Sequence, residues 1–269
     1  MSDTTASGSG LPDPKSLADS GALVIGGSAG IGFASAKKLG LAGVRRIVIV
    51  ARNAERGEAA RAELAEATGA TVHFVQGDAT LASEAARLAD EAERLLGGVD
   101  ILVVSTVAEN RPELFRDIPT ASIAGILQEM LLPAMQMVSE VMPHMAERRG
   151  GVIITVASDA GKTATPGETI IGACKAAIIM FTRTIAIEGK RNGIRANVLT
   201  PSLVHGTAST ARITEDGFSA KLFASAAKAA HLGVPEADDL GDLVAFLAGP
   251  SARRLTGQAI SVNGGISAA

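Results

Sequence analysis

The sequence predicts a single α/β domain with a doubly wound parallel sheet and helices on both of its faces. Three observations lead to this fold class. Short apolar runs rich in Val and Ile alternate along the chain with segments that have helical periodicity. A glycine-rich turn follows the first of these runs directly. No linker or internal repeat divides the 269 residues, a length that suits one sheet protein of this class.

The composition excludes several classes of function. Hydrophobic residues make up 47% of the chain, and the net charge of −3 gives no electrostatic case for nucleic acid or an anionic membrane. The chain has no Trp and no Tyr, so stacking on bases is not expected either. The longest apolar runs are short or interrupted, and we expect no membrane-spanning helix and no metal site. A single cysteine, Cys174, excludes an intramolecular disulfide and fits a reducing cytoplasm.

The first fifteen residues are polar and rich in Ser, Gly and Thr. They lack the basic segment and apolar core of a signal peptide, so we interpret residues 1–15 as a disordered arm. The folded domain is expected to span residues 16–269.

The first predicted strand, residues 22–25, leads into a glycine-rich turn and then a helix that ends near Gly43. Glycines let a backbone turn tightly and approach a pyrophosphate, while free N–H groups and the helix dipole favour negative charge. We therefore predict a dinucleotide phosphate site, with a purely structural turn as the alternative. Its binding residues are Gly26, Ser28, Gly30, Ile31 and Gly32.

The end of the second predicted strand, residues 47–50, bears on the choice of nucleotide. An acidic residue at this place would bind the ribose 2′-hydroxyl of NAD. Ala51 offers no such acceptor, and Arg52 can pair with a 2′-phosphate. The sequence therefore favours NADP(H) over NAD(H), with a solvated surface role for Arg52 as the alternative.

The middle of the chain continues the alternation. Strands are predicted at residues 72–75 and 101–104, joined by an amphipathic helix over 82–96. A helical stretch over 121–148 holds five methionines, which we interpret mainly as adaptable core filling. The β-branched run 152–156 predicts a buried strand that delivers Ser158 at its end. A helix then starts near Glu168 and places Ile171 and Lys175, four residues apart, on one face.

These motifs resemble the short-chain dehydrogenase/reductase family over residues 16–266. Gly26, Gly30 and Gly32 match the family's glycine spacing, while Ser158 and Lys175 match its catalytic serine and lysine. The resemblance implies a Rossmann-like fold and a nicotinamide cofactor. It also implies that Asp78 lies by the adenine ring, that Lys175 binds the nicotinamide ribose, and that Pro201 and Val204 lie at the carboxamide.

The chain departs from the family at three places. Ile171 occupies the position of the family's tyrosine, which donates a proton, and the chain contains no Tyr at all. Met130 stands near the place of the family's helix Asn. Residues 104–107 read Val-Ser-Thr-Val instead of the family's Asn-Asn-Ala-Gly.

Several groups are candidates to replace the missing proton donor. Lys175 could donate if burial lowers its pKa. Asp159 and Glu168 flank the site, but we expect both carboxylates to be solvated. His205, on the loop after the sixth predicted strand, is a further candidate, although a lone histidine on a loop is more often incidental. Cys174 is expected to pack as a small apolar residue.

These observations lead to three hypotheses. The first is an NADP(H)-dependent oxidoreductase with a non-standard active site, acting on a small hydrophobic carbonyl, imine or activated alkene. The second is a non-redox enzyme on the same scaffold, such as a cyclase, isomerase or lyase. The third is a non-catalytic nucleotide-binding subunit.

An apolar pocket floor is expected near Val107, Met130 and Ile171, and a mobile lid over residues 206–233. By resemblance, the chain forms a homodimer or homotetramer through the helices at 121–148 and 168–191.

Overall fold

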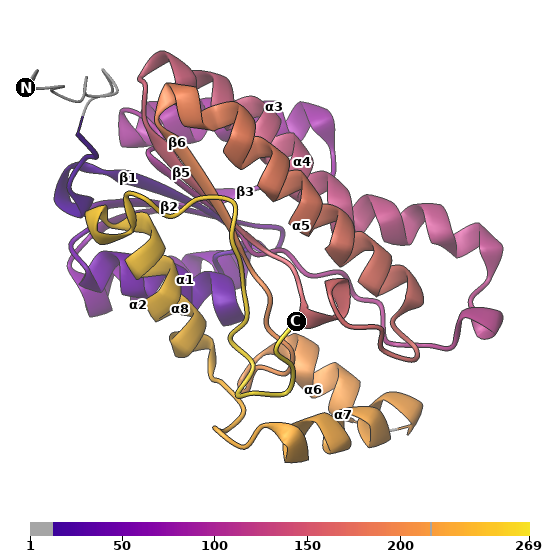
Figure 1. Cartoon of the computed structure of the whole chain (residues 1–269). Coiled ribbons are helices and arrows are strands. Elements are labelled where there is room, and N and C mark those ends of the chain that lie inside the picture. Colours follow the sequence, from indigo (N-terminus) through magenta and orange to yellow (C-terminus); the bar gives the residue numbers. More distant parts are fainter. Residues whose placement is uncertain (1–12, 216) are drawn as a thin grey trace, which may run out of the picture.

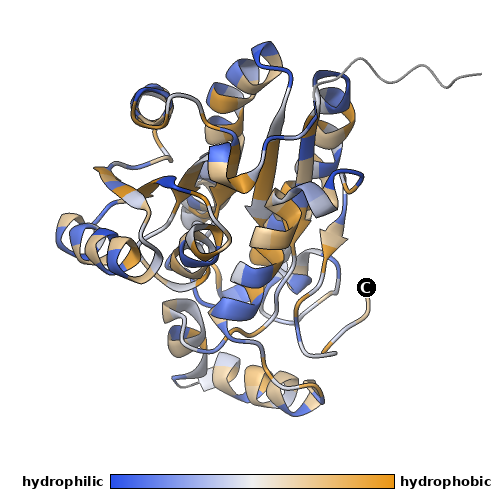
Figure 2. Ribbon diagram, turned by 90° about the vertical axis from the view of Figure 1, so that its left-hand side faces the viewer, coloured by the Kyte–Doolittle hydropathy of each residue, from blue (hydrophilic) through white to orange (hydrophobic). Residues whose placement is uncertain are grey.

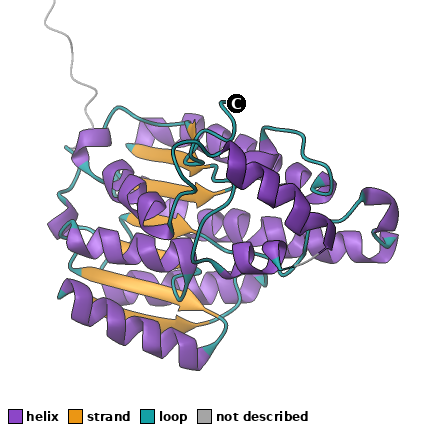
Figure 3. Cartoon of the chain, turned by 90° about the horizontal axis from the view of Figure 1, so that it is seen from below, coloured by secondary structure: helices purple, strands orange, loops and turns teal. Residues whose placement is uncertain are grey.

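The computed structural model describes residues 13–215 and 217–269. Its described part contains one sheet of seven strands in the order β3-β2-β1-β4-β5-β6-β7, and every neighbouring pair is parallel. The strands run side by side in Figure 3. The strands are β1 Gly21–Ile25, β2 Arg46–Ala51, β3 Thr71–Gln76, β4 Ile101–Val104, β5 Gly151–Val156, β6 Ile194–Leu199 and β7 Ala259–Ile260. The order reverses between β1 and β4, which confirms the doubly wound α/β fold predicted from the sequence.

The strands are apolar because both faces of the sheet are covered. Strands β1 and β4 are buried along their whole length. Successive residues of a strand point to opposite faces, so Leu23 and Ile25 join one core while Ala22 and Val24 join the other. Figure 2 shows these strands as a hydrophobic centre between helices of mixed polarity.

Helices fill the connections between the strands. The α-helices are α1 Gly30–Leu41, α2 Ala54–Thr68, α3 Ala82–Leu96, α4 Ile123–Glu147, α5 Thr169–Gly189, α6 Ala208–Thr214, α7 Gly217–Ala229 and α8 Ala237–Ala248. The short 3-10 helices are η1 Leu17–Asp19, η2 Phe115–Asp117, η3 Thr120–Ser122, η4 Asp159–Gly161, η5 Lys190–Asn192 and η6 Pro250–Ala252. Helices α3, α4 and α5 cover one face of the sheet, and α1, α2 and α8 cover the other.

Two long helices bear on the expectation that the chain has no membrane-spanning helix. The segments Thr120–Glu147 and Thr169–Asn192 are long and apolar enough, by length and composition, to cross a membrane. In the structure both pack on the sheet: Met137 and Met145 of α4 are fully buried, as is Ala186 of α5. The apolar residues on the sheet side of both helices therefore belong to the core of the domain, and the buried methionines of α4 fill that core as predicted.

The structure describes the last three residues of the predicted arm, residues 13–15. Residues 1–12 of the predicted arm lie outside the described residues. Lys15, assigned to that arm, forms an ion pair of 2.7 Å with Asp100, whose other carboxylate oxygen accepts the Gly21 N–H. This contact joins residue 15 to the start of β1 and to the loop between α3 and β4.

Residues 206–233, predicted to be a lid, contain α6 and α7. In Figure 1 these two helices lie beyond the C-terminal ends of the strands, apart from the helices that cover the sheet. The chain end and the segment after β7 pass beside them. Residues of both helices line the cavity described next.

Candidate functional site

A cavity of about 300 Å³ lies at the C-terminal edge of the sheet. Its walls come from the glycine-rich turn before α1, the ends of β4, β5 and β6, the beginning of α5, and the helices α6 and α7. Residues Ile266 and Ser267, near the chain end, complete it. Parallel sheets bind ligands at this edge, where the strand order reverses.

The glycine-rich turn has the shape that a phosphate group needs. Gly26 has a φ of 82°, and a Cβ atom there would lie 2.4 Å from the carbonyl oxygen of Ser105. Ala29, Gly30 and Ile31 line the cavity. The N-cap of α1 is Ala29, which makes no side-chain capping bond, so the first N–H groups of α1 are available to an anion. This turn fits the pyrophosphate of a dinucleotide.

Arg52 and Asp78 lie outside the cavity wall but at the same edge of the sheet. Arg52 follows β2, is exposed, and has its guanidinium 3.9 Å from the Glu109 carboxylate. Asp78 follows β3, and its Oδ1 accepts hydrogen bonds from the N–H and the hydroxyl of Thr80 at 3.0 and 2.8 Å. Ser28 is half-buried in the glycine-rich turn and is not among the cavity-lining residues.

Ser158 lies where the sequence predicts it, just after β5. Its hydroxyl oxygen accepts the N–H of Ala160 at 3.2 Å and so caps η4. The residue lines the cavity. The hydroxyl hydrogen can be donated to a substrate atom while the oxygen keeps this capping bond.

Ile171 and Lys175 both face the cavity from α5. Burial lowers the pKa of the Lys175 ammonium, an effect that the charges of Cys174 and Glu168 oppose. Cys174 is buried in a small apolar cluster, and burial raises the pKa of its thiol. The structure thus places an aliphatic side chain beside the cavity, one helical turn before the lysine.

The expectation that Asp159 and Glu168 are solvated is wrong. Asp159 is only 7% exposed, and its carboxylate accepts a hydrogen bond of 2.5 Å from the Ser267 hydroxyl. Glu168 is half-buried on the cavity wall. Burial raises the pKa of Glu168 from 4.5 to about 7; a hydrogen bond with Thr165 acts against this shift, and the charge of Asp159 adds to it.

The loop after β6 contributes two of the predicted residues. Pro201 and Val204 line the cavity. The Val204 N–H donates to the Thr210 hydroxyl at 3.2 Å and its carbonyl accepts from Thr207 at 3.0 Å, so both of its backbone groups already have partners within the chain. His205 is exposed and lies outside the cavity wall.

Sequence reasoning missed two polar groups of the cavity. In the described part of the chain, Oδ1 of Asn110 and Oγ1 of Thr163 are buried without a hydrogen-bond partner, and both residues line the cavity. Buried polar atoms usually have partners, so these two are candidates to bind a ligand. Neither residue stands in a recognisable motif; only the close spacing of Thr163 to Ser158 could have drawn attention to it.

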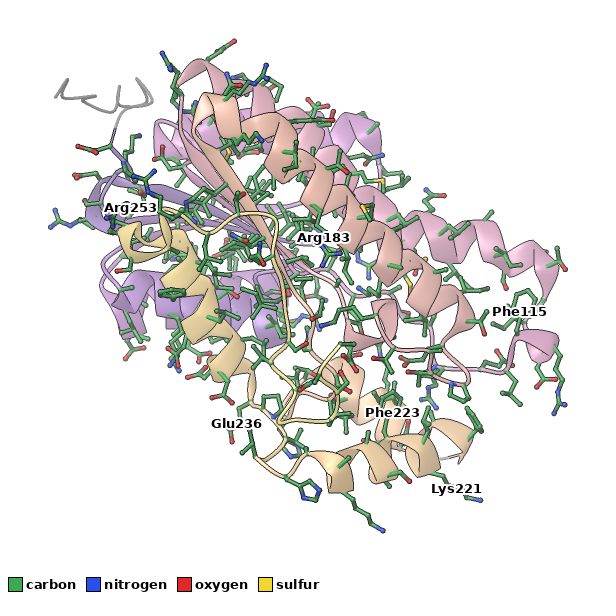
Figure 4. All side chains as sticks on the ribbon, in the orientation of Figure 1. Phe115, Arg183, Lys221, Phe223, Glu236 and Arg253 are labelled. Atoms are coloured by element: carbon green, nitrogen blue, oxygen red, sulfur yellow. The ribbon has the colours of Figure 1, made fainter. Side chains whose placement is uncertain are left out.

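The predicted apolar residues form part of the wall, and hydroxyl side chains such as Ser105, Thr165 and Ser209 form another part. Val107, Met130 and Ile171 line the same cavity. From α7, Phe223 adds a ring that is 6% exposed, and Figure 4 shows it on the side of the helix that faces the sheet. Arg212 of α6 donates to the Ala108 carbonyl at 3.3 Å. An ion pair of 2.7 Å joins the exposed Arg111 and Glu215 and also links α6 to the loop after β4.

The described residues contain no group of three or more His, Cys, Asp or Glu side chains that could hold a metal ion.

A family model described as short chain dehydrogenase matches residues 20–217. The chain belongs to the short-chain dehydrogenase/reductase family. Membership places it among oxidoreductases that use a nicotinamide nucleotide and act on small molecules.

Similar members of the short-chain dehydrogenase/reductase family cover nearly the whole chain. A 7α-hydroxysteroid dehydrogenase of Bacteroides fragilis is 30% identical over 247 residues, which are 91% of this chain and 93% of that protein. The 3-oxoacyl-acyl-carrier-protein reductase FabG of Haemophilus influenzae is 31% identical over 246 residues, covering 91% and 97%. A structure of 7α-hydroxysteroid dehydrogenase complexed with NADH and 7-oxo glycochenodeoxycholic acid is 26% identical, with a TM-score of 0.85 and coverage of 93% and 95%.

Proposed function

We propose that this short-chain dehydrogenase/reductase is an NADP(H)-dependent oxidoreductase with a non-standard active site. Its substrate is a small hydrophobic carbonyl, imine or activated alkene. One observation carries the proposal: a single cavity joins the glycine-rich turn to Ser158 and Lys175 and has an aliphatic wall at Ile171. A nucleotide bound along the turn and a substrate bound at the wall would therefore meet in one enclosed space.

The chain offers the nucleotide a continuous set of partners. The turn residues and the first N–H groups of α1 would hold the pyrophosphate. Arg52 would pair with the 2′-phosphate, Asp78 would lie by the adenine, and Lys175 would bind the nicotinamide ribose. Pro201 and Val204 would lie at the carboxamide, where Val204 exchanges its present partners for those of the ligand. When bound, the nucleotide supplies or accepts a hydride.

Ser158 would orient the substrate by donating its hydroxyl hydrogen to the substrate's heteroatom. The apolar side chains at Met130 and Ile171 exclude water and bind a hydrophobic skeleton. Ile171 has no proton to give. An iminium or a polarised carbon–carbon double bond suits such a site, because its reduction leaves no alkoxide.

A second candidate is a non-redox enzyme, such as a cyclase, isomerase or lyase, built on the same scaffold. The observation that favours it is the combination of Ile171 on the cavity wall with the engaged backbone groups of Val204. In that case the nucleotide would have a structural role or would not bind. The same two features also fit a non-catalytic nucleotide-binding subunit.

Two measurements test the proposed function. Titration with NADPH and with NADH, followed by nicotinamide fluorescence, should give saturable binding with NADPH the tighter ligand. Consumption of NADPH should then be measured with a panel of ketones, imines and enones. We expect turnover with at least one hydrophobic imine or enone. Saturable binding without turnover would point to the non-redox or non-catalytic alternatives, and the absence of binding would overturn the proposal.

We further propose that the enzyme is cytoplasmic and assembles as a homodimer or homotetramer through α4 and α5. On α5 the side chains of Met180 and Ile187 are 59% and 61% exposed, a large apolar surface for a helix of an isolated domain. Light scattering after gel filtration should give a mass of two or four chains. Replacing both side chains by Ser should yield monomers, and an unchanged mass in that variant would overturn this assembly.

A further inference from the structure

We propose that Glu168 replaces the missing phenol as the group that gives a proton to the substrate. This inference rests on the proposed oxidoreductase function and assigns a catalytic residue within it. Glu168 is the N-cap residue of α5 and makes no side-chain capping bond with its own helix. It lines the cavity together with Ser158, Ile171 and Lys175.

The helix explains why these residues share one wall. Glu168, at the N-cap, precedes Ile171 by three residues and Lys175 by seven, and all three line the cavity where α5 begins. The carboxyl group therefore lies one turn from the position that a phenol would occupy. A glutamate side chain is long enough to reach a heteroatom in the cavity from that turn.

The other titratable groups of the cavity have different tasks. Of the described residues that line it, three have ionisable side chains: Asp159, Glu168 and Lys175. The Asp159 carboxylate accepts the hydroxyl of Ser267, and its N–H donates to the Pro201 carbonyl at 2.7 Å, so it ties the strand end to the chain end. Lys175 is assigned to the nicotinamide ribose of the bound nucleotide. Glu168 forms no ion pair with any described residue.

The surroundings of Glu168 raise the pKa of its carboxyl group, so that both protonation states are populated near neutral pH. Burial is the largest cause of its raised pKa of about 7, and the charges of Asp159 on η4 and Lys175 on α5 act in opposite directions. On the loop beside it, the Glu113 N–H donates to the Gly167 carbonyl; the side chains of Glu113 and Arg111 are exposed, and Arg111 pairs with Glu215.

Helix α7 packs against the chain next to Glu168. A Cβ atom on Gly167 would lie 2.6 Å from a ring carbon of Phe218, so α7 packs directly against the residue that precedes Glu168. A carboxyl group with a pKa near the working pH is well suited to general acid–base catalysis, because both protonation states are populated.

The proton transfer balances in the direction of reduction. A hydride from the nicotinamide nucleotide forms a new C–H bond, and the nucleotide is oxidised by two electrons as the substrate is reduced. The π electron pair of the C=O or C=N group moves to the heteroatom and forms a bond with the proton of Glu168. The carboxylate left on Glu168 then takes a proton from water, and Ser158 holds the heteroatom by a hydrogen bond throughout.

The test compares wild type with Glu168→Gln, which keeps the size and polarity of the side chain but cannot titrate. NADPH consumption is measured between about pH 5 and pH 9 with the best imine or ketone of the panel. We expect the wild-type rate of reduction to fall above pH 7. The variant should be roughly 100-fold slower or worse and should lack this inflection. Glu188→Gln, at the exposed end of the same helix, serves as the matched control and should behave as wild type.

A second readout is independent of turnover. With glutamate carboxyl groups labelled by carbon-13, the NMR signal that is absent from Glu168→Gln should titrate near pH 7 in the wild-type protein. NADPH fluorescence titration should show that the variant still binds the nucleotide. If Glu168→Gln does not fold, Glu168→Asp takes its place and should shift the inflection and lower the rate.

The outcomes separate this inference from the proposed function. An unchanged rate and pH profile in Glu168→Gln would overturn the role of Glu168 and leave an oxidoreductase with another proton source. A Glu168 signal that titrates near its ordinary value would do the same. If the wild-type protein oxidises NADPH with no member of the panel, the proposed function falls, and the catalytic role of Glu168 falls with it.

Discussion

A Cβ atom placed on Gly32 would lie 2.2 Å from the carbonyl oxygen of Gly26 and 2.8 Å from its carbonyl carbon. The first turn of α1 therefore touches the backbone of the preceding turn, and both partners are main-chain atoms that have little room to move. This contact sets the position of the N–H groups that face the cavity. A glycine is required at residue 32 for a reason of space, because its φ is not in the left-handed region.

Gly32→Ala should accordingly weaken nucleotide binding and the fold together. Overpacking of this kind costs about 1–3 kcal/mol of unfolding free energy. We expect the Kd for NADPH to rise at least roughly tenfold, since each ~1.4 kcal/mol is a factor of ten. Gly125→Ala, in α4 where a Cβ atom meets nothing within 4 Å, is the control and should bind as wild type. Normal NADPH affinity in Gly32→Ala would contradict the phosphate role of this turn.

Arg52→Gln tests the choice between NADP(H) and NAD(H). A hydrogen bond to a charged group contributes about 1.5–3 kcal/mol, so loss of the guanidinium should weaken NADPH binding roughly 10- to 100-fold. NADH binding should change little, because NADH carries no 2′-phosphate. Arg45→Gln, at the opposite end of β2, provides the control. Equal losses for both nucleotides would argue against a phosphate contact at Arg52.

Ile171→Tyr should create an ordinary ketone reductase from this cavity. The new phenol would lie on the cavity wall, one helical turn before Lys175, whose charge lowers the pKa of a neighbouring hydroxyl. In the Glu168→Gln background, which lacks the acid proposed above, general acid help from the phenol is worth about 100- to 10,000-fold in rate, so we expect ketone reduction to rise by at least the lower value. Ile171→Phe supplies the same ring without the hydroxyl. A gain that is equally large in the Phe variant would show that packing, not proton transfer, is responsible.

The raised pKa of Glu168 also predicts how stability depends on pH. A carboxyl group whose pKa is higher in the folded than in the unfolded chain stabilises the fold fully at low pH and loses this contribution as pH rises. The loss should run from 4.5 to about 7. Urea unfolding across this range should show a decline in wild type that Glu168→Gln removes.

Glu84 serves as the comparison in that experiment, because its contribution to stability changes with pH in the opposite direction. A hydrogen bond from Arg87 holds the pKa of Glu84 below 4.5, so its contribution is present above that pH and is lost on acidification. Glu84→Gln should therefore leave the decline above pH 4.5 in place. The prediction fails if Glu168→Gln retains the wild-type slope or if Glu84→Gln abolishes it.

Phe223→Ala should enlarge the apolar end of the cavity and weaken substrate binding. Burial of a phenylalanine side chain is worth about 1.5–3 kcal/mol, of which the substrate shares a part, so KM should rise roughly tenfold with NADPH affinity unchanged. Lys221→Ala, on the outer side of α7 in Figure 4, is the control and should leave KM as it is. A lower kcat at unchanged KM would mean that Phe223 acts on a step other than binding.

The fold was predictable because its signals are local and repeated. The strand at residues 101–104 and the helix at 82–96 have the bounds that periodicity predicts. Buried parallel strands are apolar on both faces, and the helices between them carry one apolar stripe each. Helices α4 and α5 are long and apolar by composition, and part of that apolar surface packs on the sheet.

The site was only partly predictable. Gly30, Ser158, Ile171 and Lys175 reach one cavity because each follows a strand end or shares a helix face, which the chain order already implies. Asn110 and Thr163 carried no motif. Their importance appears only when the packing of distant loops leaves their oxygens without partners.

By itself the sequence determined a doubly wound sheet, a glycine-rich turn at its edge and the absence of any phenol that could act as an acid. The tertiary structure decided which carboxyl groups lose contact with water. Asp159 is held by Ser267, 108 residues later, and Phe218 of α7 lies against Gly167, the residue before Glu168. Desolvation depends on all atoms within a few ångströms, whatever their distance along the chain, so the protonation of Glu168 belongs to the assembled fold.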